Sequence, residues 1–141
     1  MAESYVPEID AICIQPDRTI EGVGFQKGFI GIYTKSGSCA ELTHHEEMCM
    51  DVVEGVNPEI AATLKSPLYY FNRLKSRFEG RGDGKLLMET LIKILDEHTI
   101  TVVNPMVPSG RLKAGPLFKF FMRYGFKPIG RRVLIREPNK V

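Results

Sequence analysis

The most regular pattern of apolar positions in this chain lies in residues 85–97. Apolar residues recur there at steps of three and four, at Leu87, Met88, Leu91, Ile94 and Leu95. That spacing places these side chains on one face of a helix, with the charged residues on the other. The pattern therefore predicts an amphipathic helix over Lys85–Glu97.

Two runs of a different kind flank this helix. Leu68–Leu74 is rich in aromatic residues, and Thr99–Val103 is rich in β-branched residues. Both types of side chain favour the extended, half-buried environment of a strand. A strand is thus expected before the helix and another after it. Proline at 105, 108 and 116 indicates a loop and then the start of a further helix.

The N-terminal half contains weaker signals. Strands are expected over Ala11–Ile14 and Gly28–Thr34, and a turn at residues 35–38 would pair the second with a strand over Cys39–Thr43. Helices are expected over His44–Val53 and Pro58–Lys65. Asn57 suits the N-cap of the latter, because its side chain can accept a hydrogen bond from the first turn.

Three alternate glycines, at positions 80, 82 and 84, join the aromatic strand to the amphipathic helix. Glycine adopts positive φ readily and lets a ligand approach the backbone. The first N–H groups of the helix would then point at that ligand, and the helix dipole favours a negative charge there. This segment is therefore predicted to bind an anion through backbone amides.

The spacing excludes two familiar phosphate loops. A P-loop needs glycine where this chain has Glu79, and serine or threonine where it has Leu86. A dinucleotide fingerprint needs its third glycine three residues after the second, whereas Gly84 follows Gly82 by two.

The segment resembles the acetyl-CoA-binding motif of the GCN5-related N-acetyltransferase (GNAT) superfamily, written Q/R-x-x-G-x-G/A and followed by a Leu-rich helix. The match can begin at Arg77 or at Glu79. The register from Glu79 is preferred, because it aligns the helix and places Phe78 at the aromatic position that precedes the motif. Glu79 then departs from the motif at its first position.

A second match lies downstream, where Leu117–Lys127 is similar to the family's final helix and turn, L-Y-E-K-x-G-F. The expected order is strand, glycine loop, helix, strand, helix, Gly-Phe and strand. The resemblance implies an α/β fold, with one GNAT-type domain over residues 1–141 and a mixed central sheet flanked by helices. Residues 67–141 would form its cofactor-binding half and residues 1–66 the substrate side.

The same resemblance implies acetyl-CoA as cofactor and transfer of its acetyl group to an amine of a small molecule or a protein. The expected cofactor-binding residues are Leu74, Ser76, Gly80, Arg81, Gly82, Asp83, Gly84, Lys85 and Phe121. The backbone N–H near Leu74, where a splayed strand leaves donors free, is expected to polarise the thioester carbonyl.

The general acid and base are less clear from the sequence. The family usually has a tyrosine four residues before the glycine, to protonate the leaving thiolate, but this chain has Phe121, which cannot donate a proton. Tyr124 is a candidate substitute, although a packing role is favoured. Candidates for the base are Glu41 and His45, within a group that also holds His44, Glu46 and Glu47; a charged helix start is the favoured interpretation of the histidine–glutamate cluster.

Composition agrees with one globular domain. A chain of 141 residues with 43% hydrophobic content can bury a single substantial core. The first residues lack a basic start and a long apolar run, so a cytoplasmic protein without a membrane span is expected. Its three cysteines lack metal-type spacing and H-E-x-x-H is absent, so neither a disulfide framework nor a metal is predicted.

Charge is divided unevenly along the chain. Residues 1–66 hold 4 Lys and Arg against 11 Asp and Glu, whereas residues 67–141 hold 15 against 6. The basic half suits the phosphates of CoA, and the acidic half suits a cationic amine. The alternatives are a non-catalytic acyl-CoA-binding regulatory module or, less favoured, a protein that binds nucleic acid through its basic half. The oligomeric state is left open, with a homodimer among the options.

Overall fold

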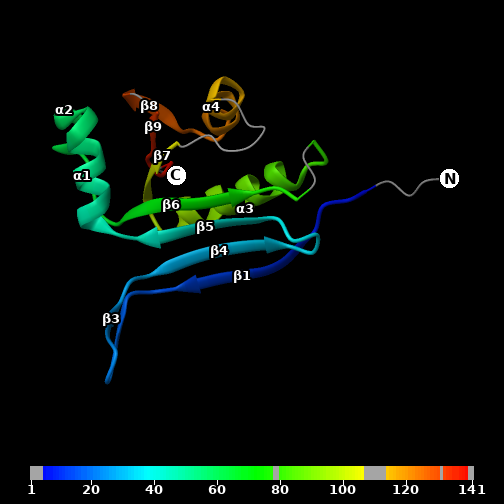
Figure 1. Cartoon of the computed structure of the whole chain (residues 1–141), viewed down its shortest axis with the longest axis horizontal. Helices are drawn as coiled ribbons and strands as arrows, with labels where there is room; N and C mark the ends of the chain where they lie inside the picture. Colours follow the sequence, from blue (N-terminus) through cyan, green and yellow to red (C-terminus); the bar gives the residue numbers. More distant parts are fainter. Residues whose placement is uncertain (1–4, 78–79, 107–113, 131, 140–141) are drawn as a thin grey trace. The chain divides into compact units, whose positions relative to one another are not determined.

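The structure is a computed structural model that describes residues 5–77, 80–106, 114–130 and 132–139. These residues form nine strands and four helices (Figure 1). In chain order the elements are β1 (Ile9–Gln15), β2 (Arg18–Ile20), β3 (Gly24–Gln26), β4 (Phe29–Thr34), β5 (Cys39–His44), α1 (Glu46–Val56), α2 (Pro58–Ala61), β6 (Leu68–Lys75), α3 (Asp83–Glu97), β7 (Thr101–Pro105), α4 (Ala114–Met122), β8 (Lys127–Gly130) and β9 (Val133–Arg136).

Seven of the strands pair in the order β1-β4-β5-β6-β7-β9-β8, and β2 pairs with β3 separately. The pair β6–β7 is parallel, whereas β1–β4, β4–β5, β7–β9 and β8–β9 are antiparallel. The expected α/β fold with a mixed sheet is thus confirmed. The expected order of strand, loop, helix, strand, helix, Gly-Phe and strand is also found from β6 to β8.

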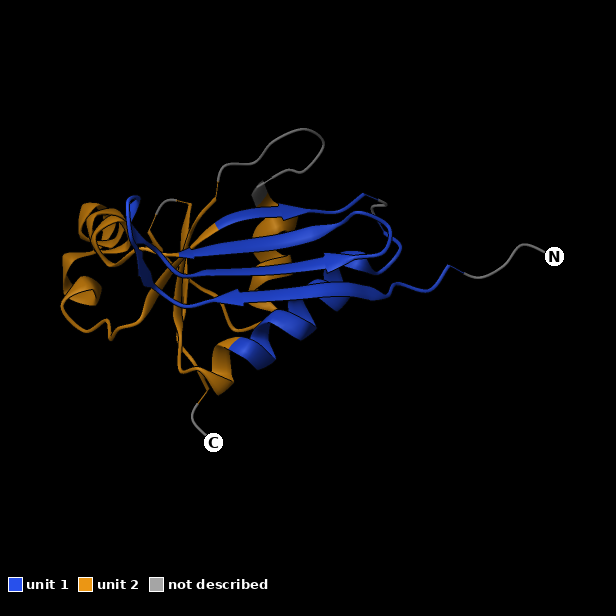
Figure 2. Ribbon diagram, turned by 90° about the horizontal axis from the view of Figure 1, so that it is seen from below, with its two compact units in different colours: residues 1–43, 72–94 blue, residues 44–71, 95–141 orange. Residues whose placement is uncertain are grey.

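The chain divides into two compact units that interleave along the sequence (Figure 2). Unit 1 comprises residues 1–43 and 72–94, and unit 2 comprises residues 44–71 and 95–141. Both β6 and α3 contribute residues to each unit.

In unit 1, the predicted hairpin of β4 and β5 is confirmed, and β1 pairs with the free edge of β4. The turn between β4 and β5 contains Gly37 at φ +96°, a conformation that other residues rarely adopt. Alternate residues of the two strands are buried, at Ile30, Ile32, Ala40 and Leu42. Since side chains alternate across a strand, one face of this hairpin contributes to the core of the unit.

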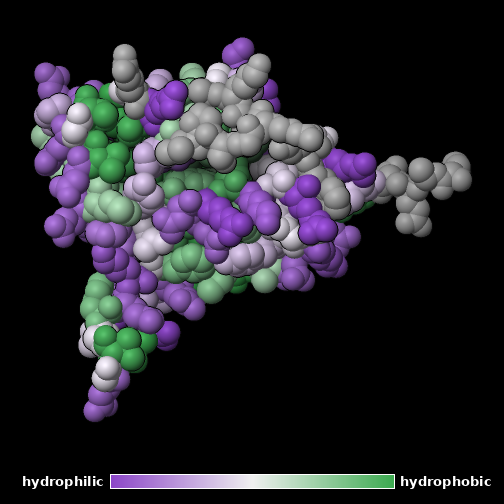
Figure 3. Space-filling model, viewed as in Figure 1, coloured by the Kyte–Doolittle hydropathy of each residue, from purple (hydrophilic) through white to green (hydrophobic). Residues whose placement is uncertain are grey.

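The β2–β3 hairpin of unit 1 was not predicted. Each strand has only three residues, and the segment mixes charged residues with glycines, so neither strand has a recognisable alternation. Val23 and Phe25 of this hairpin are among the most exposed large apolar side chains of the described residues. Figure 3, viewed as Figure 1, shows hydrophobic atoms at the surface around β3.

In unit 2, the two helices predicted before β6 are confirmed, but with different ends. The side chain of His45 accepts the Met48 N–H at 3.2 Å, so His45 caps α1, which begins at Glu46 rather than His44. Asn57 caps α2 as expected, with Pro58 in the first turn. The Thr63 hydroxyl donates to the Ile60 carbonyl at 2.8 Å, which favours a turn and accompanies the early end of α2.

The helices α1 and α2 share a core cluster with β6 to β9 in unit 2. Its buried members are Cys49, Val53, Ala61, Leu68, Val103, Ile129, Val133 and Ile135. Thr99 lies at the end of α3 with φ 55°, so β7 begins at Thr101, two residues later than expected. The predicted final helix is confirmed as α4, and Gly125 at φ +89° turns the chain into Phe126 and β8.

A buried ion pair joins the end of α3 to β9 in unit 2. The Arg136 side chain is 2% exposed, and its guanidinium donates to Asp96 at 2.8 and 3.3 Å and to the Tyr124 carbonyl at 2.6 Å. Hydrogen bonds from Arg136 hold the pKa of the Asp96 carboxyl below its ordinary 3.8, against the opposing effect of burial. Breaking such a pair leaves a buried charge without a partner.

We expect Asp96→Ala to lower the free energy of unfolding by about 3–5 kcal/mol, because the Arg136 guanidinium would stay buried without its carboxylate. Urea denaturation measures this. Glu97→Ala, at an exposed neighbouring carboxylate of the same helix, is the matched control and should change stability by less than about 0.5 kcal/mol. Equal effects of the two substitutions would contradict the structural importance of the pair.

Candidate glycine-loop site

The glycine loop before α3 is described from Gly80 onward. Gly80 and Gly82 have φ values of +76° and +92°. The Leu86 N–H donates to the Gly82 carbonyl at 3.0 Å, so Gly82 is the N-cap of α3. The N–H groups of residues 83–85 therefore have no acceptor within the helix. Phe78 and Glu79, which the motif match uses, lie outside the described residues.

The three glycines have different roles. At Gly80 an added Cβ would meet no atom within 4 Å, and at Gly82 it would meet Pro7 Cγ at 3.1 Å, but both positions have positive φ. Gly84 lies inside the first turn of α3 and is not among the residues with positive φ. The expectation of positive φ thus holds for Gly80 and Gly82. At Gly84 the expected benefit of glycine is that a ligand can come close to the backbone, because no side chain stands in the way.

Asp83, the first residue of α3, has a role that its sequence context did not indicate. Its carboxylate is 0% exposed. It accepts hydrogen bonds from three hydroxyl groups of unit 1: Tyr5 at 2.5 Å, Ser36 at 2.5 Å and Ser38 at 2.6 Å. Burial alone would raise the pKa of Asp83, but these hydroxyl donors outweigh it and hold the pKa below the ordinary 3.8. The side chain of Asp83 is thus an internal anchor of the loop, and its expected contact with the cofactor stays a prediction for its backbone N–H.

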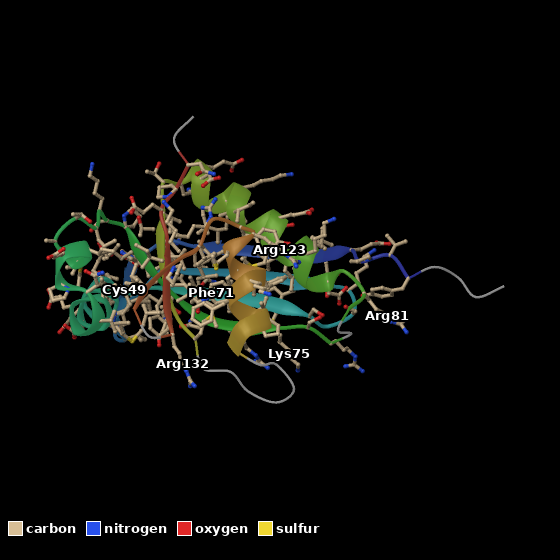
Figure 4. All side chains as sticks on the ribbon, turned by 90° about the horizontal axis from the view of Figure 1, so that it is seen from above. Cys49, Phe71, Lys75, Arg81, Arg123 and Arg132 are labelled. Carbon is tan, nitrogen blue, oxygen red and sulfur yellow. The ribbon has the colours of Figure 1, made fainter. Side chains whose placement is uncertain are left out.

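Two cations of the loop are exposed. The Arg81 guanidinium lies 5.9 Å from the centre of the Tyr5 ring, within the range of a cation–π contact. Lys85 lies 3.8 Å from Glu89, one turn further along α3. Both side chains reach solvent, as Figure 4 shows for Arg81. They add two positive charges to the end of a helix that already favours anions.

The strand before the loop, β6, pairs with β7 over only part of its length. The register of β6 with β7 runs from Leu68↔Thr101 to Tyr70↔Val103, and β6 continues for five further residues. Leu74 and Ser76, both expected to contact the cofactor, lie half-buried beyond this register, at the end of β6 and directly after it. The register of β6 with β7 ends at Tyr70, which is consistent with the splayed strand expected near Leu74.

Phe121 lies in an aromatic cluster of unit 2. Its ring is 3% exposed and meets Phe71 and Phe126 edge to face, with centroid separations of 5.5 and 5.2 Å. Phe71 is the first residue of β6 beyond its register with β7. Position 121 is therefore brought to the place where the two strands stop pairing, and the side chain there is apolar.

Tyr124 follows α4. Its ring packs edge to face on Phe120, with centroids 5.3 Å apart, and its carbonyl accepts the Arg136 guanidinium. These contacts use the ring and the backbone carbonyl of Tyr124, and its packing role stays a prediction.

Glu41 is part of a polar cluster on β4, β5 and β6 of unit 1. The Tyr33 hydroxyl donates to its carboxylate at 2.9 Å, and Arg73 lies 4.0 Å from it. Burial, followed by the hydrogen bond to Glu41, raises the pKa of Tyr33 to about 12. Tyr33 therefore stays protonated at neutral pH and acts as a donor to Glu41.

His45, the other candidate base, belongs to unit 2 and uses its Nδ1 to cap α1. The neighbouring His44 stacks on Tyr69, with ring centroids 5.1 Å apart, and lies 3.4 Å from Glu46. The favoured interpretation of this cluster as a charged helix start is thus confirmed for His45 and Glu46. Glu46 also accepts the Leu68 N–H.

Cys49 is fully buried, and burial, followed by Glu46, raises the pKa of its thiol to about 12. Hardly any thiolate would form at neutral pH, so an acyl-cysteine route through Cys49 has no support.

No group of three or more metal-ligating side chains occurs in the described part of the chain. None of the helices described is long and apolar enough to cross a membrane.

Several residues of these sites were missed by the sequence analysis. They are Tyr5, Ser36 and Ser38 around Asp83, and Tyr33 beside Glu41. Hydroxyl residues at a turn carry no signal of a carboxylate 45 or more residues away, so the Asp83 contacts could not be predicted.

Searches of protein-family models, curated protein sequences and solved structures found no match to this chain.

We expect Asp83→Asn to be less stable than the wild type at pH 7 by about 1.5–3 kcal/mol, since hydrogen bonds to a charged acceptor are lost. The pKa of Asp83 is lowered in the folded state, so its stabilisation is complete above the ordinary pKa of 3.8 and is lost as pH falls through the lower folded value. Urea denaturation between pH 7 and pH 2 should show the two proteins converging in acid. A difference that is the same at every pH would contradict this role of the carboxylate.

Proposed function

We propose that this protein is an acetyl-CoA-dependent N-acetyltransferase of GNAT type. The observation that carries the proposal is the loop Gly80–Lys85, which combines two glycines at positive φ with N–H groups at the start of α3 that have no acceptor within the helix. Such groups bind phosphate through the backbone and the helix dipole. The order of elements from β6 to β8 and the Gly125–Phe126 turn agree with the two sequence motifs.

In this proposal the pyrophosphate of CoA lies on the amides of residues 80–85, with Arg81 and Lys85 adding positive charge. The backbone N–H near Leu74 polarises the thioester carbonyl. The amine nitrogen forms the new C–N bond, the C–S bond breaks, and the thiolate leaves as CoA.

Two proton transfers accompany the reaction. Glu41 is the favoured base, acting directly or through water, because the Nδ1 of His45 already caps α1. Phe121 cannot protonate the thiolate, and the ring of Tyr124 packs on Phe120. The thiolate therefore takes its proton from water.

A second candidate is a non-catalytic module that binds acyl-CoA for regulation. The specific observation in its favour is the apolar cluster around Phe121, at the position where the family usually has its acid. Calorimetric titration with acetyl-CoA, followed by an assay of free thiol release with a panel of primary amines, separates the candidates. Binding with turnover supports the enzyme, binding without turnover supports the module, and no binding of CoA overturns both.

We expect Gly82→Val and Gly84→Val each to reduce acetyl-CoA affinity by about a hundredfold or more, since several charge-assisted hydrogen bonds would be misdirected or blocked. Gly82→Val strains a residue at positive φ, whereas Gly84→Val fills the space over the first turn of α3. Calorimetry of the folded variants measures the effect.

Gly55→Val is the matched control, because it lies in α1 where an added Cβ meets no atom within 4 Å. It should bind acetyl-CoA as the wild type does. Wild-type affinity in both loop variants would overturn the phosphate-binding role of the loop.

We expect Tyr124→Phe to keep kcat within about tenfold of the wild type, because the packing on Phe120 needs only the ring. The measurement is steady-state acetyl transfer at saturating acetyl-CoA and amine. A loss of about a hundredfold or more in kcat with the fold intact would instead identify Tyr124 as the general acid.

A further inference from the structure

Asn104 is a buried polar residue whose side-chain nitrogen has no partner. It lies on β7 and is 4% exposed. Within the described residues, its Nδ2 finds no hydrogen-bond acceptor. A buried amide without a partner costs free energy, and such groups are rare in folded proteins. The structure therefore contains a donor that an additional group could satisfy.

The location of Asn104 indicates where that group would lie. The last pair of β6 and β7 is Tyr70↔Val103, so Asn104 is the first residue of β7 beyond the register. On its other side β7 stays paired, with Asn104 opposite Leu134 of β9. The backbone of β7 is thus held in place by β9, while on the side next to β6 the pairing has ended before Asn104.

The alternation of side chains also shows to which face of the sheet Asn104 projects. Val103 belongs to the core cluster beneath α1 and α2. Side chains alternate along a strand, so Asn104 projects to the opposite face. By the same alternation from Leu68, Phe71 projects to that face too, where it meets Phe121. The unpaired amide therefore shares its face with an aromatic cluster that has no hydrogen-bond acceptor on its rings.

We propose that Asn104 is a positioning residue that donates a hydrogen bond from Nδ2 to a carbonyl oxygen of the bound acyl thioester, either of the acyl group or of an amide in the arm that carries it. This inference rests on the proposed function. A thioester arm presents carbonyl acceptors along a slender, largely apolar chain, which suits one amide donor beside apolar rings. The hydrogen bond would fix the position of the thioester arm beside these rings before the amine attacks the acyl group.

The test is Asn104→Leu, which removes the donor and keeps a side chain of similar size. Calorimetry with acetyl-CoA, CoA and adenosine 3′,5′-bisphosphate, with the wild type alongside, measures the effect. We expect acetyl-CoA affinity to fall by about ten- to a hundredfold, as for one lost buried hydrogen bond, with no change for the bisphosphate, which lacks the arm. A loss shared by CoA identifies an amide carbonyl as the acceptor, and a loss confined to acetyl-CoA identifies the thioester carbonyl.

Thermal unfolding without ligand provides a second readout. Asn104→Leu should be as stable as the wild type or more so, because an unpaired buried amide is replaced by an apolar group.

Thr101→Val is the matched control for the affinity measurements. It removes a buried hydroxyl of the same strand on the other face and should leave the affinities for all three ligands unchanged.

The outcomes separate this inference from the proposed function. If the wild type binds acetyl-CoA and Asn104→Leu binds it equally well, the role of Asn104 is overturned and the proposed function stands. If Asn104→Leu is strongly destabilised without ligand, Asn104 is structural and the inference also fails. If the wild type binds none of the three ligands, both are overturned.

Discussion

The start of α3 depends on a carboxylate that no solvent reaches. Asp83 is held by hydroxyl groups from the N-terminal segment and from the turn between β4 and β5, all within unit 1. A buried carboxylate is stable only when such donors surround it, so the three segments must come together for the loop to form. The Ser38 hydroxyl also accepts the Arg77 N–H at 2.8 Å, which ties the chain entering the loop to the same turn.

This arrangement resolves a conflict in the charge of the loop. An aspartate in the first turn of a helix would compete with a bound anion for the positive end of the dipole. Here the carboxylate is satisfied by hydroxyl groups, so it does not need the N–H groups of the first turn. Residues 80–85 hold the exposed cations Arg81 and Lys85 besides this buried carboxylate. The Asp83 carboxylate thus holds the loop in place without accepting hydrogen bonds from the first N–H groups of α3.

The aromatic cluster in unit 2 sets the chemistry that the proposed enzyme can use. Phe71, Phe121 and Phe126 surround the place where β6 leaves β7, and none of them can transfer a proton. An apolar environment of this kind strengthens any hydrogen bond made inside it. In unit 2 the amide of Asn104 would therefore act on a carbonyl more strongly than in water, whereas these rings supply no proton for the thiolate.

Regular elements were predictable from the sequence where many residues repeat one signal. The stripe of Leu87, Leu91 and Leu95 predicted α3 to within two residues of its start, and the aromatic run predicted β6. The three-residue strands β2 and β3 had too few positions for a period to show. His45 and Thr63 moved helix ends through single side-chain hydrogen bonds, which periodicity does not detect.

Some features of the candidate sites were predictable from the sequence, and others depend on the fold. The glycine spacing predicted the loop and the positive φ of Gly80 and Gly82, because only backbone freedom explains alternate glycines there. The partners of Asp83 and Glu41 could not be predicted, since they depend on which turns and strands meet in space. The burial of Asn104 without a partner is likewise a property of the fold.

A crystal structure of the protein with CoA would test the central claim most directly, because it locates the pyrophosphate relative to the loop. The account predicts pyrophosphate oxygens at about 2.7–3.2 Å from backbone nitrogens of Gly80–Lys85. A pyrophosphate bound elsewhere, with the N–H groups of this loop facing only solvent, would contradict it.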